Sequence, residues 1–146
     1  MLLWQQVDTC AWVENERITR NDLALRGAVI KVFFSDTDAA KKIALNQLIN
    51  TMVKAEVLRR QGYPVTEAQL QSESENIESS EYKDKLPQIK AILTKREQYF
   101  RLFVLPIFVE KSLTAHFGQR SDYTRWLVSE NSKVKWFIKP NFELSR

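Results

Sequence analysis

The stretch "FRLFVLPIFVEK", residues 100–111, decides how the chain folds because it holds the most apolar run in the sequence. Eight apolar residues follow one another from Leu102 to Val109, with Pro106 among them. A membrane-spanning helix needs about 18 or more apolar residues, and Arg101 and Glu110 bound this run. We therefore expect no membrane span here. The run is either a core element or a surface that holds an apolar partner.

Two interpretations of this run stay open. In the first it is core, and Pro106 ends one helix and begins another, or kinks one, because proline lacks an N–H and crowds the carbonyl of Leu102. In the second its apolar circumference exceeds what neighbouring helices cover, and the surplus marks a partner site. The candidate peptide-binding residues are Tyr99, Phe100, Phe103, Val104, Ile107 and Phe108, with Leu70 and Ile77 from a preceding polar helix.

Composition favours a helical domain without a metal or catalytic centre. The 146 residues suffice for one domain with a sizeable core, and three glycines and four prolines are too few for a turn-rich β fold. A single cysteine, Cys10, and a single histidine, His116, exclude an internal disulfide and a four-ligand zinc site. We read Cys10 as a small buried hydrophobe rather than a nucleophile, and expect no cofactor. The net charge of +4 is spread out, so nucleic-acid binding is the least favoured function.

Helix boundaries are marked by capping residues. Thr19 and Asp22 predict a helix start, and the helix should stop near Ser35. The clearest helix follows, with Asp36 and Asp38 at its start and Gly62 as the residue after its end. Thr66 and Gln69 form a second capping box. The buried face of the clearest helix is predicted to hold Leu45, Leu48, Ile49, Met52, Val53 and Val57, which recur at helical spacing.

The second half of the chain should also be helical. Residues 66–79 are polar nearly all round, so only Ala68, Leu70 and Ile77 are available to dock, and we expect a lightly packed, mobile arm. Residues 82–93 give a short helix that begins anew at Pro87. A long helix runs from Lys95 to Gly118, and a final one follows.

Short strands are expected at both ends, over residues 9–14 and 133–139. Asn15 lies where the first strand must reverse, and asparagine tolerates φ > 0. Isolated strands have no partners for their backbone groups, so we predict that the two pair, with Trp12 and Trp136 near the seam. The predicted fold is mostly α: a single domain, residues 1–146, of about five to six helices within 20–131, with a small two-stranded ribbon joining the N- and C-terminal segments.

The order of these signals resembles a known family. "VENERIT" (13–19), a helix, and then "ALNQLINTMVKAEVLRRQGYPVTEAQL" (44–70) are similar to the N-terminal region of SurA-type periplasmic chaperones and the related PpiD and PrsA foldases. Asn15 stands where the family has glycine. The matching positions are Val13, Ile18 and Thr19 in the turn and Leu48, Ile49, Ala55, Gly62, Val65, Thr66 and Leu70 in the helix pair.

The resemblance implies a helical module that holds unfolded polypeptide, with both terminal segments assembling together across an inserted parvulin isomerase domain. That insertion is missing between Phe117 and Lys133, so we expect binding and no enzyme activity. We therefore expect non-catalytic, chaperone-like binding of unfolded or extended polypeptide in a groove between residues 66–80 and the long helix. The alternatives are a structural, oligomerisation or peptide-escort subunit with a fixed partner, including a homodimer. The resemblance implies a periplasmic or extracytoplasmic location; without a leader before Met1 the location would be cytoplasmic.

Overall fold

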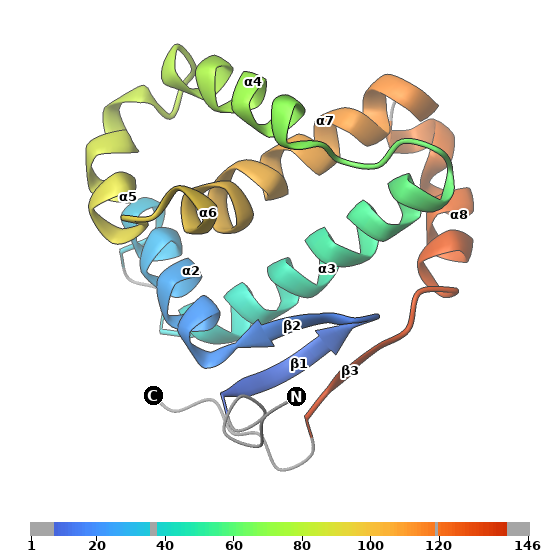
Figure 1. Cartoon of the computed structure of the whole chain (residues 1–146), viewed down its shortest axis with the longest axis horizontal. Coiled ribbons are helices and arrows are strands. Elements are labelled where there is room, and N and C mark those ends of the chain that lie inside the picture. Colours follow the sequence, from blue (N-terminus) through green and yellow to red (C-terminus); the bar gives the residue numbers. More distant parts are fainter. Residues whose placement is uncertain (1–7, 36–37, 119, 140–146) are drawn as a thin grey trace.

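The computed structural model describes residues 8–35, 38–118 and 120–139, and only the backbone of residues 120–123. Helices form most of this part of the chain, with a small sheet against one side of them (Figure 1). The elements are β1 (Thr9–Val13), β2 (Glu16–Thr19), α2 (Arg20–Phe33), α3 (Ala40–Arg60), α4 (Glu67–Glu78), the 3-10 turn η1 (Lys83–Lys85), α5 (Leu86–Ile92), α6 (Arg96–Tyr99), the π-helical turn η2 (Phe100–Val104), α7 (Leu105–Phe117), α8 (Arg120–Asn131) and β3 (Trp136–Ile138). The prediction of a mostly α single domain is confirmed.

The sheet joins the two ends of the described chain, as predicted. Its order is β2-β1-β3, and β1 pairs antiparallel with both neighbours. Trp12 lies opposite Phe137 and stacks on it with ring centroids 4.7 Å apart, while Trp136 lies opposite Val13. The prediction of two strands is wrong, because Glu16–Thr19 forms a third strand, β2, instead of continuing the turn into the helix. Ile18 of β2 is buried completely, and this burial holds the short strand on the helices.

The turn between β1 and β2 takes its left-handed residue one position earlier than expected. Glu14, not Asn15, has positive φ, at 50°. Glu14 donates its N–H to the carbonyl of Lys135 (2.7 Å), and its carboxylate accepts from the N–H of Lys135 (2.9 Å) and from Arg60 (2.7 Å). These bonds to the C-terminal segment offset the cost of placing a non-glycine residue in the left-handed region.

The predicted caps are present. The side chains of Thr19 and Asp22 form one capping box and those of Thr66 and Gln69 another. Gly62, with φ of 91°, follows α3 in a Schellman arrangement, in which Tyr63 N–H bonds the Leu58 carbonyl and Gly62 N–H bonds the Arg59 carbonyl.

The start of α3 differs from the prediction. The helix begins at Ala40 without a side-chain cap and without an acidic residue in its first turn. Asp38 precedes it in a turn, and Asp36 lies outside the described residues. The predicted apolar face of α3 is buried throughout and forms the centre of the core.

The long helix occupies the predicted range but is not uniform. α6, η2 and α7 follow one another as one rod, and within η2 the N–H of Leu105 bonds the carbonyl of Phe100, five residues back. Pro106 has no N–H with which to bond Leu102, four residues earlier. Arg26 of α2 instead donates to the Leu102 carbonyl at 2.9 Å. The proline therefore lies just after a π turn whose freed carbonyl is satisfied from another helix.

The arm α4 is docked rather than lightly packed. Ile77 is 1% exposed, and the carboxylate of Glu73, which is buried, accepts from Lys111 of α7 at 2.6 Å. Ala68 is exposed and docks nothing, whereas Leu70 is partly buried. Figure 1 shows α4 running across the rod on the side away from the sheet. No helix of the described residues is both long and apolar enough to cross a membrane.

Candidate functional site

The predicted peptide-binding residues divide into a buried set and a partly exposed set. Tyr99, Phe100, Phe103, Val104 and Ile77 are buried in the core. Leu70, Ile107 and Phe108 are partly exposed. The structure therefore uses one face of the rod as core and leaves parts of its other faces accessible, so the core interpretation holds for the buried face. Whether the accessible part marks a partner site stays a prediction. The contact of these residues with peptide stays a prediction.

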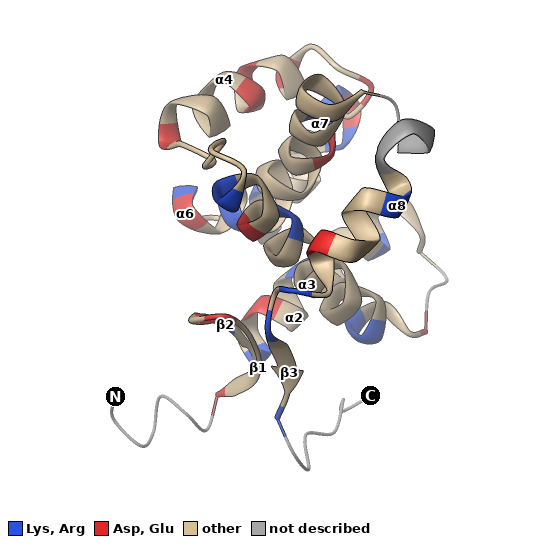
Figure 2. Ribbon diagram, turned by 90° about the vertical axis from the view of Figure 1, so that its right-hand side faces the viewer, with Lys and Arg blue, Asp and Glu red and all other residues tan. Residues whose placement is uncertain are grey.

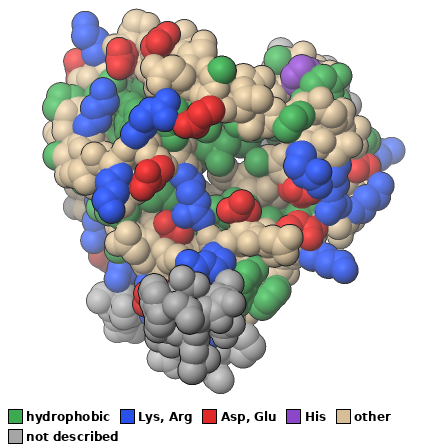
Figure 3. Space-filling model, viewed as in Figure 1, with side chains coloured by type: hydrophobic (Ala, Val, Ile, Leu, Met, Phe, Trp, Pro, Cys, Tyr) green, Lys and Arg blue, Asp and Glu red, His purple; other side chains and the backbone are tan. Residues whose placement is uncertain are grey.

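One hollow lies between α3, the residues before α4, α4 itself and the rod. We call it the Leu105 hollow; its volume is about 390 Å³. In Figure 3 it is the recess near the middle of the face, with hydrophobic side chains around it and charged ones on its rim. Its apolar lining is Met52, Ala55, Pro64, Val65, Leu70 and Leu105, and its charged lining is Glu16, Glu56, Arg59 and Arg101.

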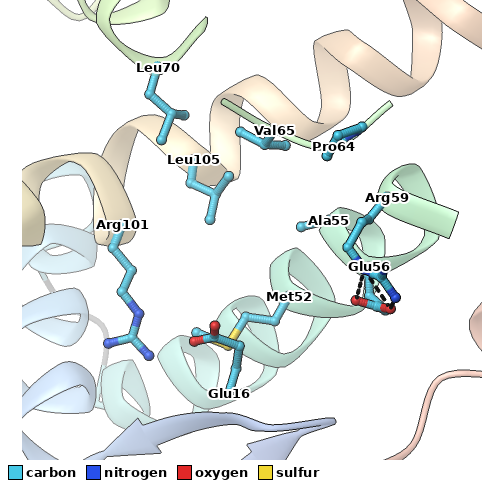
Figure 4. A pocket seen from close by; sticks show the side chains of 10 residues that line it. All are labelled: Glu16, Met52, Ala55, Glu56, Arg59, Pro64, Val65, Leu70, Arg101 and Leu105. Carbon is cyan, nitrogen blue, oxygen red and sulfur yellow. Dashed lines mark hydrogen bonds and ion pairs between the residues drawn. The ribbon is translucent and has the colours of Figure 1, made fainter. Parts of the chain in front are cut away.

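The walls of the Leu105 hollow come from segments that the caps position. Figure 4 shows Leu70 descending from α4 and Leu105 from α7 toward Met52 and Ala55 on α3. Gly62 follows the end of α3 and the Thr66 cap starts α4. The short segment between them places Val65 in one wall of the Leu105 hollow. Of the described arm residues, only Leu70 lines this hollow, and α3 supplies its opposite wall. A client-binding groove between residues 66–80 and the long helix stays a prediction.

The charges around this hollow are mostly paired within the chain. Arg59 bonds Glu56 within the same turn of α3, which lowers the pKa of Glu56. Arg101 donates to the Asp22 carboxylate at 2.8 Å and also to the carbonyl of Arg17. Glu16 is exposed, and its side chain bonds no other described residue. The rim is therefore polar but nearly neutral, and the apolar walls dominate what the hollow can bind.

A second hollow of about 230 Å³ lies on the other side of the rod and is called the Arg26 hollow. Its lining is Arg26, Val29, Ile30, Phe33, Phe34, Gln47, Tyr82, Phe103 and Ile107. Leu105 and Ile107 are two positions apart on α7, so their side chains leave the helix about 200° apart. The two hollows therefore flank the same turn of the rod. Sequence reasoning identified Phe103 and Ile107 but missed Arg26 and Gln47, which lie far away in the sequence.

The described residues that could bind a metal or act as a nucleophile or base do not form a cluster. They contain no group of three or more His, Cys, Asp or Glu side chains that could hold a metal. Cys10 is fully buried, its Sγ bonds the carbonyl of Ile18 at 3.1 Å, and burial raises its pKa to about 11. The thiol is thus protonated at neutral pH, as expected for a core residue. His116 lies elsewhere, exposed at the end of α7 and stacked on Tyr63.

In comparisons with known proteins, no family model, no curated protein and no solved structure matches this chain.

Proposed function

We propose that this chain binds extended polypeptide without catalysis and that the Leu105 hollow receives an apolar side chain of the bound segment. The observation that carries the proposal is an open hollow of about 390 Å³ with apolar walls from four separate segments and a nearly neutral polar rim. Burial of apolar area contributes roughly 25 cal/mol per Å² and is non-directional. Such a site accepts many apolar side chains, while the rim bonds water or client backbone.

The sequence resemblance to SurA-type chaperone modules supports the same proposal. In both, the two ends of the chain meet and a helix pair follows a V-x-N/G turn. We propose no isomerase activity, because the parvulin domain that is inserted in the similar family is missing here.

The test is a matched pair of tryptophan substitutions in the full chain. Ala55→Trp places a large ring in the Leu105 hollow, while Ala68→Trp places the same ring on the exposed outer side of α4. We expect the wild type and Ala68→Trp to bind a fluorescent, extended, leucine-rich peptide and to suppress aggregation of a denatured model protein. Ala55→Trp should lose both. Equal binding by Ala55→Trp and Ala68→Trp would remove the hollow from the proposal, and no binding by the wild type would remove the function.

A structural role through a second copy of the chain is the other candidate, and β3 favours it. Trp136, Phe137 and Ile138 are 50%, 53% and 42% exposed, and within the described sheet the outer edge of β3 pairs with no strand. An exposed apolar edge strand is a template for pairing with another chain. Light scattering of the wild type and of Ile138→Lys decides between the candidates. A stable dimer that the lysine breaks, without any suppression of aggregation, would favour the structural role.

A further inference from the structure

The Arg26 hollow contains a cation that no carboxylate of the described residues neutralises. Arg26 forms no ion pair with any described residue, whereas Arg59, Arg60, Arg96 and Arg101 each pair with a carboxylate. The partners of Arg26 are neutral: Gln47 Oε1 accepts from its Nε at 3.0 Å and from its Nη2 at 2.7 Å, and the Leu102 carbonyl accepts from its Nη1. Burial lowers its pKa to about 10, so Arg26 remains a cation at neutral pH.

Those three bonds fix the guanidinium and leave donors available. Arginine has five N–H groups, so two of them have no acceptor among the described residues. The amide nitrogen of Gln47 and the hydroxyl of Tyr82, which also line the hollow, likewise bond no described side chain. Among the described residues that line this hollow, the polar groups are therefore a held cation and two neutral donors, and none of these residues is acidic. Such a set suits an anion with two oxygen atoms.

The rest of the lining is apolar and largely aromatic. Phe33 meets Tyr82 edge-on, and Tyr82 meets Phe103 in the same way, with ring centroids 5.8 and 5.7 Å apart. Phe34 is 65% exposed, so it lines the hollow without being part of the core. A volume of about 230 Å³ lies below the 300–1,000 Å³ typical of sites for drug-sized ligands. The occupant must be small, with one anionic end and one apolar end.

We propose that the Arg26 hollow binds a small free monocarboxylic acid as its anion, with the carboxylate on Arg26 and Gln47 and the hydrocarbon part among Val29, Ile30 and Phe103. Binding supplies the counter-ion that the described residues do not provide for Arg26, and the partly buried position strengthens the pairing because water screens it less. This site is independent of the Leu105 hollow, which lies across the rod.

The test uses hexanoate, hexan-1-ol and hexylamine as probes of the isotope-labelled full chain at pH 7, followed by NMR. Hexanoate should shift amide signals of α2 and of residues 103–107, hexan-1-ol should bind about tenfold more weakly or worse because it lacks the charge, and hexylamine should not bind. Absence of hexanoate shifts, or equal affinity for the alcohol, would overturn the proposal. So would binding only of a peptide with a free carboxyl end.

A substitution that preserves the contacts of Arg26 makes the test specific. Gln47→Glu keeps an oxygen acceptor on Arg26 but adds a carboxylate to the hollow, so hexanoate should bind about tenfold more weakly or worse. Gln88→Glu adds the same charge at an exposed position of α5 and should leave binding unchanged. Ile107→Trp fills the hollow and should abolish binding. Ala55→Trp should bind hexanoate as the wild type does, which separates this proposal from the polypeptide-binding proposal. Unchanged affinity in both Gln47→Glu and Ile107→Trp would place hexanoate elsewhere.

Discussion

The two hollows flank one turn of the rod, but they differ in whether their arginine side chains pair with a carboxylate. Around the Leu105 hollow both arginines have carboxylate partners within the chain, and the Glu16 carboxylate, which has no partner in the described part of the chain, is exposed to solvent. In the Arg26 hollow the cation is partly buried and bonds only neutral acceptors. An exposed charge can stay unpaired at little cost in free energy because water solvates it. A partly buried cation carries a desolvation penalty that a bound anion offsets.

This difference is the reason for proposing different ligands for two hollows that lie so close together. The Leu105 hollow offers area without a fixed polar contact, so it can accept many side chains at modest affinity. The Arg26 hollow has less apolar area but contains one oriented cation, which favours an anionic ligand. Figure 2 shows that Lys and Arg elsewhere are interleaved with Asp and Glu over the helices, so the selectivity lies in Arg26 and not in a broad field.

The largest effect on stability is expected from Ile77→Ala. This substitution also distinguishes the two hollows, because only one of them depends on α4. Ile77 is 1% exposed, so its truncation should lower the free energy of unfolding by about 2–4 kcal/mol. Because α4 supplies Leu70 to the Leu105 hollow but nothing to the Arg26 hollow, peptide binding should weaken while hexanoate binding persists in the folded fraction. Urea unfolding measures the loss of stability, and titrations with the leucine-rich peptide and with hexanoate measure the two binding effects.

Leu70→Ala is the matched control for Ile77→Ala. Leu70 is partly exposed and lines the hollow, so its truncation should weaken peptide binding at a much smaller cost in stability. Equal destabilisation by the two truncations would contradict the assignment of Ile77 to the core and of Leu70 to the site.

A smaller effect is expected from Arg26→Met, which tests whether Arg26 also has a structural role. The substitution keeps an apolar stem but leaves the carbonyl of Leu102 without its donor, since Pro106 cannot replace it. Loss of the partner of a buried carbonyl should destabilise the fold by about 1–3 kcal/mol. Arg59→Met, on the rim of the other hollow, removes only an exposed ion pair and should lower the urea midpoint far less than Arg26→Met does. If both variants unfold at the same urea concentration, the contrast between the two arginines is wrong.

The sequence was sufficient for the local features of this fold. Both capping boxes, Gly62 and the buried face of α3 depend on residues a few positions apart, so spacing and side-chain chemistry identify them. Pairing of the terminal strands was predictable too, because each strand needed a partner. The third strand was missed because four residues, Glu16–Thr19, carry too weak an alternation to separate a strand from a turn.

The candidate sites were predictable only in part. Phe103, Ile107 and Leu70 stand out by composition, and all three line hollows. Arg26 does not, because its partner Leu102 is 76 positions away and the bond depends on Pro106 freeing that carbonyl. Burial of Phe100 and Val104 likewise depends on how the rod turns at η2, and a 3.6-residue period does not describe a π turn.

The smallest effect is expected from acid, and it should appear at the Leu105 hollow. The hydrogen bond from Arg59 holds the pKa of Glu56 below its ordinary value of 4.5, with Arg60 adding to the shift. The folded chain therefore binds this proton less readily than the unfolded chain, so the stability that Glu56 contributes is present above pH 4.5 and is lost as the pH falls through its folded-state pKa. Replacement by Glu56→Gln should lower the urea midpoint slightly at pH 7, and the gap to the wild type should close toward pH 3. Glu97→Gln, at an exposed position without an ion pair among the described residues, should show no such gap. A gap for Glu56→Gln that stayed constant with pH would mean that its carboxylate acts by shape and not by charge, and the pairing of charges on this rim would no longer distinguish the two hollows.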